Sequence, residues 1–188
     1  VKRVHVLTQT KVQFGMQPDN NDLQAAKEAV EEAKRLFPEN ETVRMLSVDF
    51  MSTEGDFAGA TQAVDELIAS SDGDDAIPYV FKANTTAQQA MMHLQMAQQY
   101  GNQQEAAKAK ELFDETEALY KTALDLDPNS LEAMVQSAQL KTMLGDMKGS
   151  LELTVRALPL SRSRDEALEV LNLKVMTEAQ VIAVDELQ

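Results

Sequence analysis

The chain has 188 residues, no cysteine and a formal net charge of −14. The lack of cysteine excludes disulfides, a thiolate zinc site and a cysteine nucleophile, and the negative charge argues against a nucleic-acid partner, because a phosphate backbone requires clustered Lys and Arg. Aromatic residues make up only 5% of the sequence and Trp is absent, so helix-forming Ala, Leu, Gln, Glu and Met fill the chain and an all-α fold is expected.

In chain order, the apolar periodicity and the positions of Gly and Pro predict helices that follow one another in pairs. The third pair is longer than the others and turns at Tyr100-Gly101-Asn102. The expected pairs cover residues 2–14 and 21–36, 41–53 and 56–70, 76–100 and 105–126, and 131–143 and 146–158.

A last helix is expected from Ser163, because Glu166 follows three residues later and the two can form a capping box. The apolar residues of this helix lie on one stripe, which predicts that it packs on the last pair and caps its open end. The stripe consists of Leu168, Leu171, Val175, Ala179 and Ile182.

An internal repeat sets the architecture. The segment from Gly55 to Ala60 recurs as Gly145 to Ser150, 90 residues later, and Ala33–Asn40 recurs as Ala123–Ser130 at the same distance. Ala26 and Ala60 lie 34 residues apart, which is the length of a tetratricopeptide repeat (TPR). The sequence therefore predicts one domain over 1–188, a right-handed superhelical TPR solenoid with repeats at about 2–38, 41–72, 76–128 and 131–160 and a capping helix at 163–187.

A solenoid of this kind binds other polypeptides, and the first helices of the pairs line its concave groove. The groove candidates are Met45, Asp49, Val80, Asn84, Val135 and Gln139. The three apolar candidates either contact a bound segment or belong to the core between helices, and the sequence leaves both readings open. Met91, Met92 and Met96 are expected in the core.

The sequence offers no catalytic or metal-binding constellation. Its two histidines, His5 and His93, lack the spacing of a zinc site, and no nucleophile is placed beside either. We therefore expect no enzyme activity, no metal and no cofactor. No apolar run is long enough to span a bilayer, so no membrane insertion by this chain is expected. Because the sequence opens at Val1 without a methionine, we expect a fragment of a longer protein.

Three segments together resemble the C-terminal part of the seventy-kilodalton import receptors of the mitochondrial outer-membrane translocase (TOM). The first is Ala76–Ala83, which opens a helix that runs to Gln88-Gln89. The second is Leu126–Ser130 followed by Ala138–Lys141. The third joins Gly145-Asp146-Met147, Ala157, Arg162–Glu166 and Thr177–Gln180. Gly149-Ser150 and Thr154 depart from the family pattern, in which an acidic residue with Ala and a large apolar residue are usual.

The resemblance implies a docking site for unfolded mitochondrial precursor proteins on the cytosolic face of the outer membrane. Chaperones would bind only through upstream domains that this chain lacks. A TPR domain that binds the C-terminal carboxylate of a chaperone does so with Lys and Asn side chains at the six groove positions. Only Asn84 fits this requirement, so acidic chaperone tails should not bind here. The alternative is a TPR scaffold or co-chaperone-type adaptor in an unrelated cytoplasmic complex.

Overall fold

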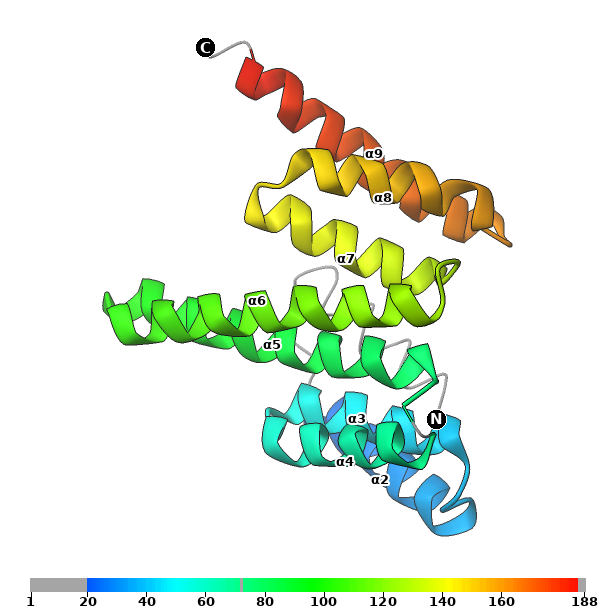
Figure 1. Cartoon of the computed structure of the whole chain (residues 1–188). Coiled ribbons are helices and arrows are strands. Elements are labelled where there is room, and N and C mark those ends of the chain that lie inside the picture. Colours follow the sequence, from blue (N-terminus) through cyan, green and yellow to red (C-terminus); the bar gives the residue numbers. More distant parts are fainter. Residues whose placement is uncertain (1–19, 72, 186–188) are drawn as a thin grey trace.

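The computed structural model describes residues 20–71 and 73–185, and all of their regular structure is helical, without a β-strand (Figure 1). The all-α prediction is thereby confirmed. The helix expected over 2–14 lies outside the described residues. The helices are α2 (Asn20–Leu36), α3 (Glu41–Glu54), α4 (Phe57–Ser70), α5 (Ala76–Tyr100), α6 (Gln103–Leu126), α7 (Leu131–Leu144), α8 (Met147–Ala157) with the 3₁₀ turn η1 (Leu158–Leu160), and α9 (Arg164–Asp185).

The recurring Gly-Asp pair makes the turn between two helices of a pair. Gly55 and Gly145 end α3 and α7 with φ of 83° and 86°, a left-handed conformation that glycine adopts without strain. The next residues, Asp56 and Asp146, are the N-caps of α4 and α8. Each carboxylate accepts a hydrogen bond from the amide three residues later, at 3.0 and 2.9 Å. This local chemistry explains why the motif recurs in two repeats.

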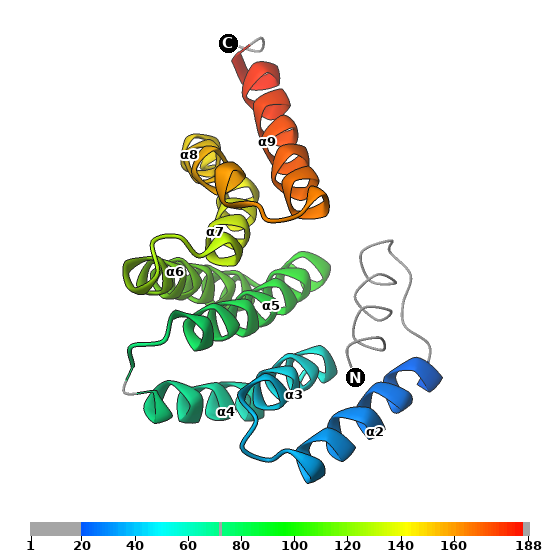
Figure 2. The same cartoon turned by 90° about the vertical axis from the view of Figure 1, so that its right-hand side faces the viewer.

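The helices stack in two layers (Figure 2). α3, α5, α7 and α9 follow one another along one side and contact their neighbours in that order, whereas α4, α6 and α8 form the other side. We call these the inner layer and the outer layer. Each outer helix packs on the inner helix before it and on the inner helix after it. α9 therefore takes the next inner-layer position after α7.

Small residues allow the close approach of these helices. Ala60, Ala83, Ala123, Ala138 and Ala157 are fully buried, without exposed surface. Around them lie three apolar clusters, centred on α3/α4, on α5/α6 and on α7/α8 with the start of α9. The core is thus divided repeat by repeat, as a solenoid requires.

The α5/α6 hairpin is longer than its neighbours and projects beyond both of them (Figure 1). Near its tip, His93 Nδ1 lies 2.5 Å from Glu105 Oε2, a contact that joins the two helices. Met91 and Met92 lie in the projecting part and are 46% and 39% exposed, so their expected place in the core was wrong. The reason is that, among the described helices, only α5 and α6 extend into this projecting part (Figure 1). Met96 is partly buried.

The terminal helix α9 packs on the stack through a face other than the expected one. Val170 and Thr177 are buried, at 1% and 0% exposure, and Leu173 packs against the same cluster. The stripe that we expected to be covered points to solvent: Leu168, Leu171, Val175 and Ile182 are 44%, 39%, 60% and 59% exposed, and Ala179 is exposed as well. The helix position was predicted correctly, but its buried face was not.

Hydroxyl groups hold α9 in place. Thr142 of α7 donates to Ser150 of α8 at 2.8 Å, and Thr177 of α9 lies 3.1 Å from Thr142 and 3.4 Å from Ser150. Ser150 and Thr177 have no exposed surface. The departure of Ser150 from the family pattern therefore has a structural use. At the start of α9 the Ser163 hydroxyl accepts from the Glu166 amide, while the Glu166 carboxylate accepts from Arg162 N, one residue earlier than in a standard capping box.

Candidate functional site: the inner face

The apolar groove candidates are core residues. Met45 is 8% exposed, Val80 3% and Val135 6%, and each belongs to a different apolar cluster. Side chains buried to this extent pack between helices and offer almost no surface to a bound segment. Of the two readings that the sequence left open, the structure therefore supports the core for all three.

The polar candidates lie nearer to solvent. Gln139 on α7 is exposed, and Asp49 on α3 and Asn84 on α5 are half-buried. Asn84 accepts a 2.6 Å hydrogen bond from the hydroxyl of Tyr120, which reaches it from the outer-layer helix α6. Tyr120 is 3% exposed, and its burial raises the pKa of the phenol. This bond fixes the position of the Asn84 side chain at the middle of the inner layer.

Three carboxylates from three inner-layer helices lie close enough for their charges to interact. Burial, and next the carboxylates of Glu169 on α9 and Asp49 on α3, raise the pKa of Glu132 on α7 above its ordinary value of 4.5. We call Asp49, Glu132 and Glu169 the inner-face acidic cluster. The charges of Glu169 and Asp49 disfavour ionisation of Glu132, so a positively charged group beside Glu132 would relieve the repulsion.

The bend of the helix stack gives this surface its shape. α5 lies between α3 and α7, and yet the Asp49 charge acts on Glu132. The Glu132 side chain is open to solvent although protein atoms surround it closely enough to raise its pKa by desolvation. In Figure 2 the stack bends so that α9 and α2 lean toward the same side as the inner layer, and the inner face therefore lies on the concave side of the bend.

Sequence reasoning missed two members of the cluster, Glu132 and Glu169. Glu132 precedes Val135 by three residues and therefore shares its side of α7, which was a usable signal. Glu169 carried no such signal, because the sequence does not say that α9 continues the inner layer rather than closing the stack. The cluster depends on the stacking of distant helices.

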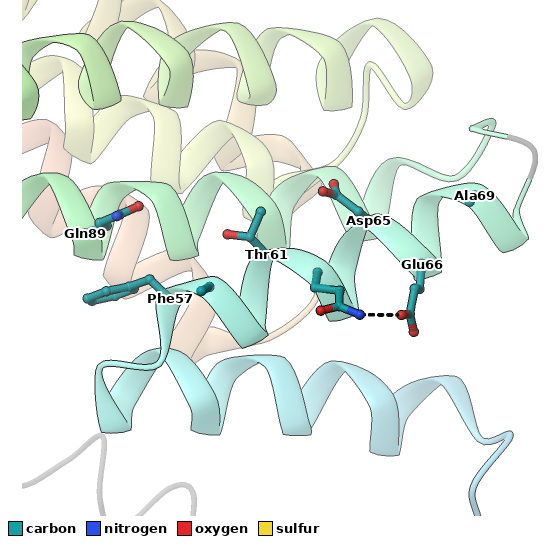
Figure 3. A pocket seen from close by; sticks show the side chains of 8 residues that line it. Phe57, Thr61, Asp65, Glu66, Ala69 and Gln89 are labelled. Carbon is teal, nitrogen blue, oxygen red and sulfur yellow. Dashed lines mark hydrogen bonds between the residues drawn. The ribbon is translucent and has the colours of Figure 1, made fainter.

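A second concave surface lies along α4 (Figure 3). It is an open hollow of about 670 Å³, and seven of its eight lining residues belong to α4. Three of its polar lining residues already have partners: Asp65 accepts from Lys82 at 2.7 Å, and Gln62 donates to Glu66 at 3.2 Å. The lining consists of Phe57, Ala58, Thr61, Gln62, Asp65, Glu66, Ala69 and Gln89. Because one helix supplies nearly all of this surface, we favour the inner face as the site.

The described residues hold no group of three or more His, Cys, Asp and Glu side chains arranged to bind a metal ion. Within the same part of the chain, no helix combines the length and the apolar character needed to cross a bilayer. The inner face is therefore described by its shape and charge alone.

Solved structures identify the architecture. The crystal structure of yeast Tom70 matches with a TM-score of 0.56 and 25% identity, over 82% of this chain and 29% of that one. A thermophilic TPR protein of Thermus thermophilus matches with a TM-score of 0.62 and 14% identity, over 93% of this chain and 81% of that one. The chain is a tetratricopeptide-repeat solenoid.

This TPR chain spans less than a third of the length of yeast Tom70, so that protein's activity as a whole does not transfer to it. The sequence matches no protein-family model and no curated protein sequence. Its structural neighbours are TPR proteins, which supports a protein-binding TPR module.

Proposed function

We propose that the chain binds polypeptide segments that carry basic side chains on its inner face, and that it is the precursor-binding part of a mitochondrial outer-membrane import receptor. The observation that supports the first half is that burial and the charges of Glu169 and Asp49, on two other inner-layer helices, raise the pKa of Glu132 on the inner side of the bent stack. A Lys or Arg of a bound segment would face all three carboxylates. It would be held by charge-assisted hydrogen bonds in a concave, partly desolvated surface.

Support for the second half is the structural likeness to yeast Tom70 together with the three sequence segments that resemble the import receptors. The second candidate is a TPR scaffold in an unrelated cytoplasmic complex. It draws on the Thermus protein, which aligns over more of the chain at a higher TM-score. The two candidates share the inner face as the binding surface and differ in the bound segment.

Peptide binding measured by fluorescence anisotropy tests the site. The probe is a labelled amphipathic peptide with four Lys or Arg residues, compared with a version in which Gln replaces them and with an acidic peptide. We expect the basic peptide to bind, binding to weaken as salt is raised, and the other two to bind at least tenfold more weakly.

A charge-reversal pair identifies the surface. Glu132→Lys with Glu169→Lys should weaken the basic peptide at least tenfold. The matched control is Glu115→Lys with Glu152→Lys, which gives the same change in net charge at exposed positions of the outer-layer helices α6 and α8. If both double variants lose affinity equally, general electrostatic attraction explains binding and the inner face is not the site.

The identity of the bound segments separates the two candidates. On an array of peptides from mitochondrial precursors and from cytoplasmic proteins of matched charge, the receptor proposal expects enrichment of precursor peptides. Equal binding of both sets would favour the scaffold. An upstream coding sequence for a membrane segment and a Lys/Asn-rich clamp would give the receptor proposal independent support.

A further inference from the structure

The exposed stripe of α9 is an unpartnered apolar helix face. Leu168, Leu171, Val175 and Ile182 are all at least 39% exposed, and they lie on the side of α9 opposite to the buried Val170 and Thr177. Exposed apolar side chains gathered on one helix face mark an interaction surface more often than scattered ones do.

The stack shows what kind of partner this face lacks. Each earlier inner-layer helix is covered by the helix that follows it: α3 by α4, α5 by α6 and α7 by α8. α9 packs on α8 and α7 in the same manner, but no described helix follows it. Its exposed stripe is thus shaped to receive one more helix, packed lengthwise.

The spacing of the stripe is symmetric about Val175. The five residues Leu168, Leu171, Val175, Ala179 and Ile182 follow one another at intervals of three, four, four and three positions. A helix that packs antiparallel on this stripe, with Val175 against Val175, would place Leu168 against Ile182 and Leu171 against Ala179. A twofold interface needs this self-complementarity, in which residue i meets j and j meets i. The pairing of a large side chain with a small one at Leu171 favours close approach of the two helices.

The charges agree with the same pairing. Arg164 lies in line with the stripe, four residues before Leu168, at the first position of α9. In the antiparallel pair it would lie beyond the partner's Ile182, at the C-terminal end of the partner helix, where the helix dipole favours a positive charge. From Leu168 to Ile182 the stripe itself carries no charged residue.

We propose that the chain forms a twofold-symmetric dimer through antiparallel packing of α9 on α9 of a second copy. A single helix stripe is smaller than the roughly 800 Å² per partner of a standard stable interface, so the dimer should depend on concentration. The proposal does not depend on what the inner face binds.

Sedimentation velocity from about 1 to about 500 µM tests the assembly. We expect a monomer–dimer equilibrium within this range and a loss of at least tenfold in association for Val175→Lys, because two like charges meet on the twofold axis. The matched control is Val155→Lys on α8, since Val155 is 57% exposed and Val175 is 60% exposed. Circular dichroism should show equal helicity for both variants.

A monomer at every concentration would overturn the proposal and would leave the stripe to another polypeptide or to a further segment of the parent protein. Dimers that Val155→Lys weakens as much as Val175→Lys would overturn it as well, because the interface would then lie elsewhere.

Cysteine cross-linking tests the direction of packing, and the chain has no native cysteine to interfere. Under mild oxidation Val175→Cys should form a disulfide-linked dimer, since the two copies of residue 175 face each other. Leu168→Cys alone should link poorly, whereas an equal mixture of Leu168→Cys and Ile182→Cys should give the heterodimer. Efficient self-linking of Leu168→Cys would indicate parallel helices and refute the antiparallel model.

Discussion

Replacing Thr177 by valine tests how α9 is held on the stack. Thr177 has no exposed surface, and its hydroxyl donates to the Leu173 carbonyl at 2.9 Å while facing the hydroxyls of Thr142 and Ser150. Valine keeps the shape but presents a methyl group to the two remaining hydroxyls. A buried hydroxyl that loses a partner costs about 1–3 kcal/mol, and we expect Thr177→Val to weaken the attachment of α9 by about 1–2 kcal/mol.

The three hydroxyls should behave as one unit. If Thr142→Val and Ser150→Ala are added to Thr177→Val, the interface becomes apolar throughout and no hydroxyl is left without a partner. Replacement of all partners by apolar groups of similar shape is nearly neutral. The triple variant should therefore be no less stable than Thr177→Val alone, whereas independent contributions would sum.

Hydrogen exchange read by mass spectrometry is the suitable assay, because a terminal helix of a solenoid can open without global unfolding. Thr177→Val should accelerate exchange in α9 about fivefold to thirtyfold, which corresponds to 1–2 kcal/mol. The control is Thr53→Val, which removes an exposed hydroxyl bonded in the same way, to Asp49 O at 2.9 Å. Unchanged exchange in Thr177→Val, or a triple variant that loses the sum of the single effects, would refute the reasoning.

Two further predictions concern a turn and the acidic cluster. Gly145→Ala should destabilise the chain by about 1–2 kcal/mol and Gly145→Asn by less, because φ at Gly145 is 86° and asparagine tolerates the left-handed region better than alanine. Equal urea midpoints for the two variants would contradict this prediction. The pKa of Glu132 is raised in the folded state, so the folded protein loses stability as the pH rises above 4.5 and this carboxyl ionises. Glu132→Gln removes the ionisable group and should therefore raise the free energy of unfolding at neutral pH. The gain should vanish as the pH falls toward 4.5, and urea midpoints that show a gain independent of pH would count against the acidic cluster.

The sequence was sufficient to predict the fold because the relevant signals are local. Gly55, Gly145 and Asp146 determine turns and caps through their own backbone and side chains, so helix ends were readable from residue types. The pairing of helices followed from the repeat length. None of these inferences required knowledge of which distant residues meet.

The candidate site was predicted less well, because it depends on how repeats stack. Met45, Val80 and Val135 occupy groove positions by analogy, but the close approach of successive inner-layer helices buries them. A lysine at Val80 or Val135 would for the same reason put a charge into the core and destabilise the fold, so such variants cannot test peptide binding.

The face of α9 illustrates a more general limit. Amphipathic spacing showed where its apolar side chains lie but not which surface covers them. The face that packs on the stack includes Thr177, and near it Lys174 and Glu178, which bond to each other at 2.5 Å. Besides the apolar contacts of Val170 and Leu173, this face is held by hydroxyl bonds, which a hydrophobicity pattern does not register.

The unequal lengths of the helix pairs bear on the order in which the chain folds. In a solenoid each repeat contacts only its neighbours, so stability spreads along the chain from the most stable pair. The α5/α6 hairpin has 25 and 24 residues, whereas α3 and α4 have 14 each. Its two helices pack mainly on each other and are joined by a short turn, and such local contacts form quickly because short loops lose little entropy. It should therefore be the nucleus on which the shorter pairs assemble, and the last part of the solenoid to unravel when the ends fray.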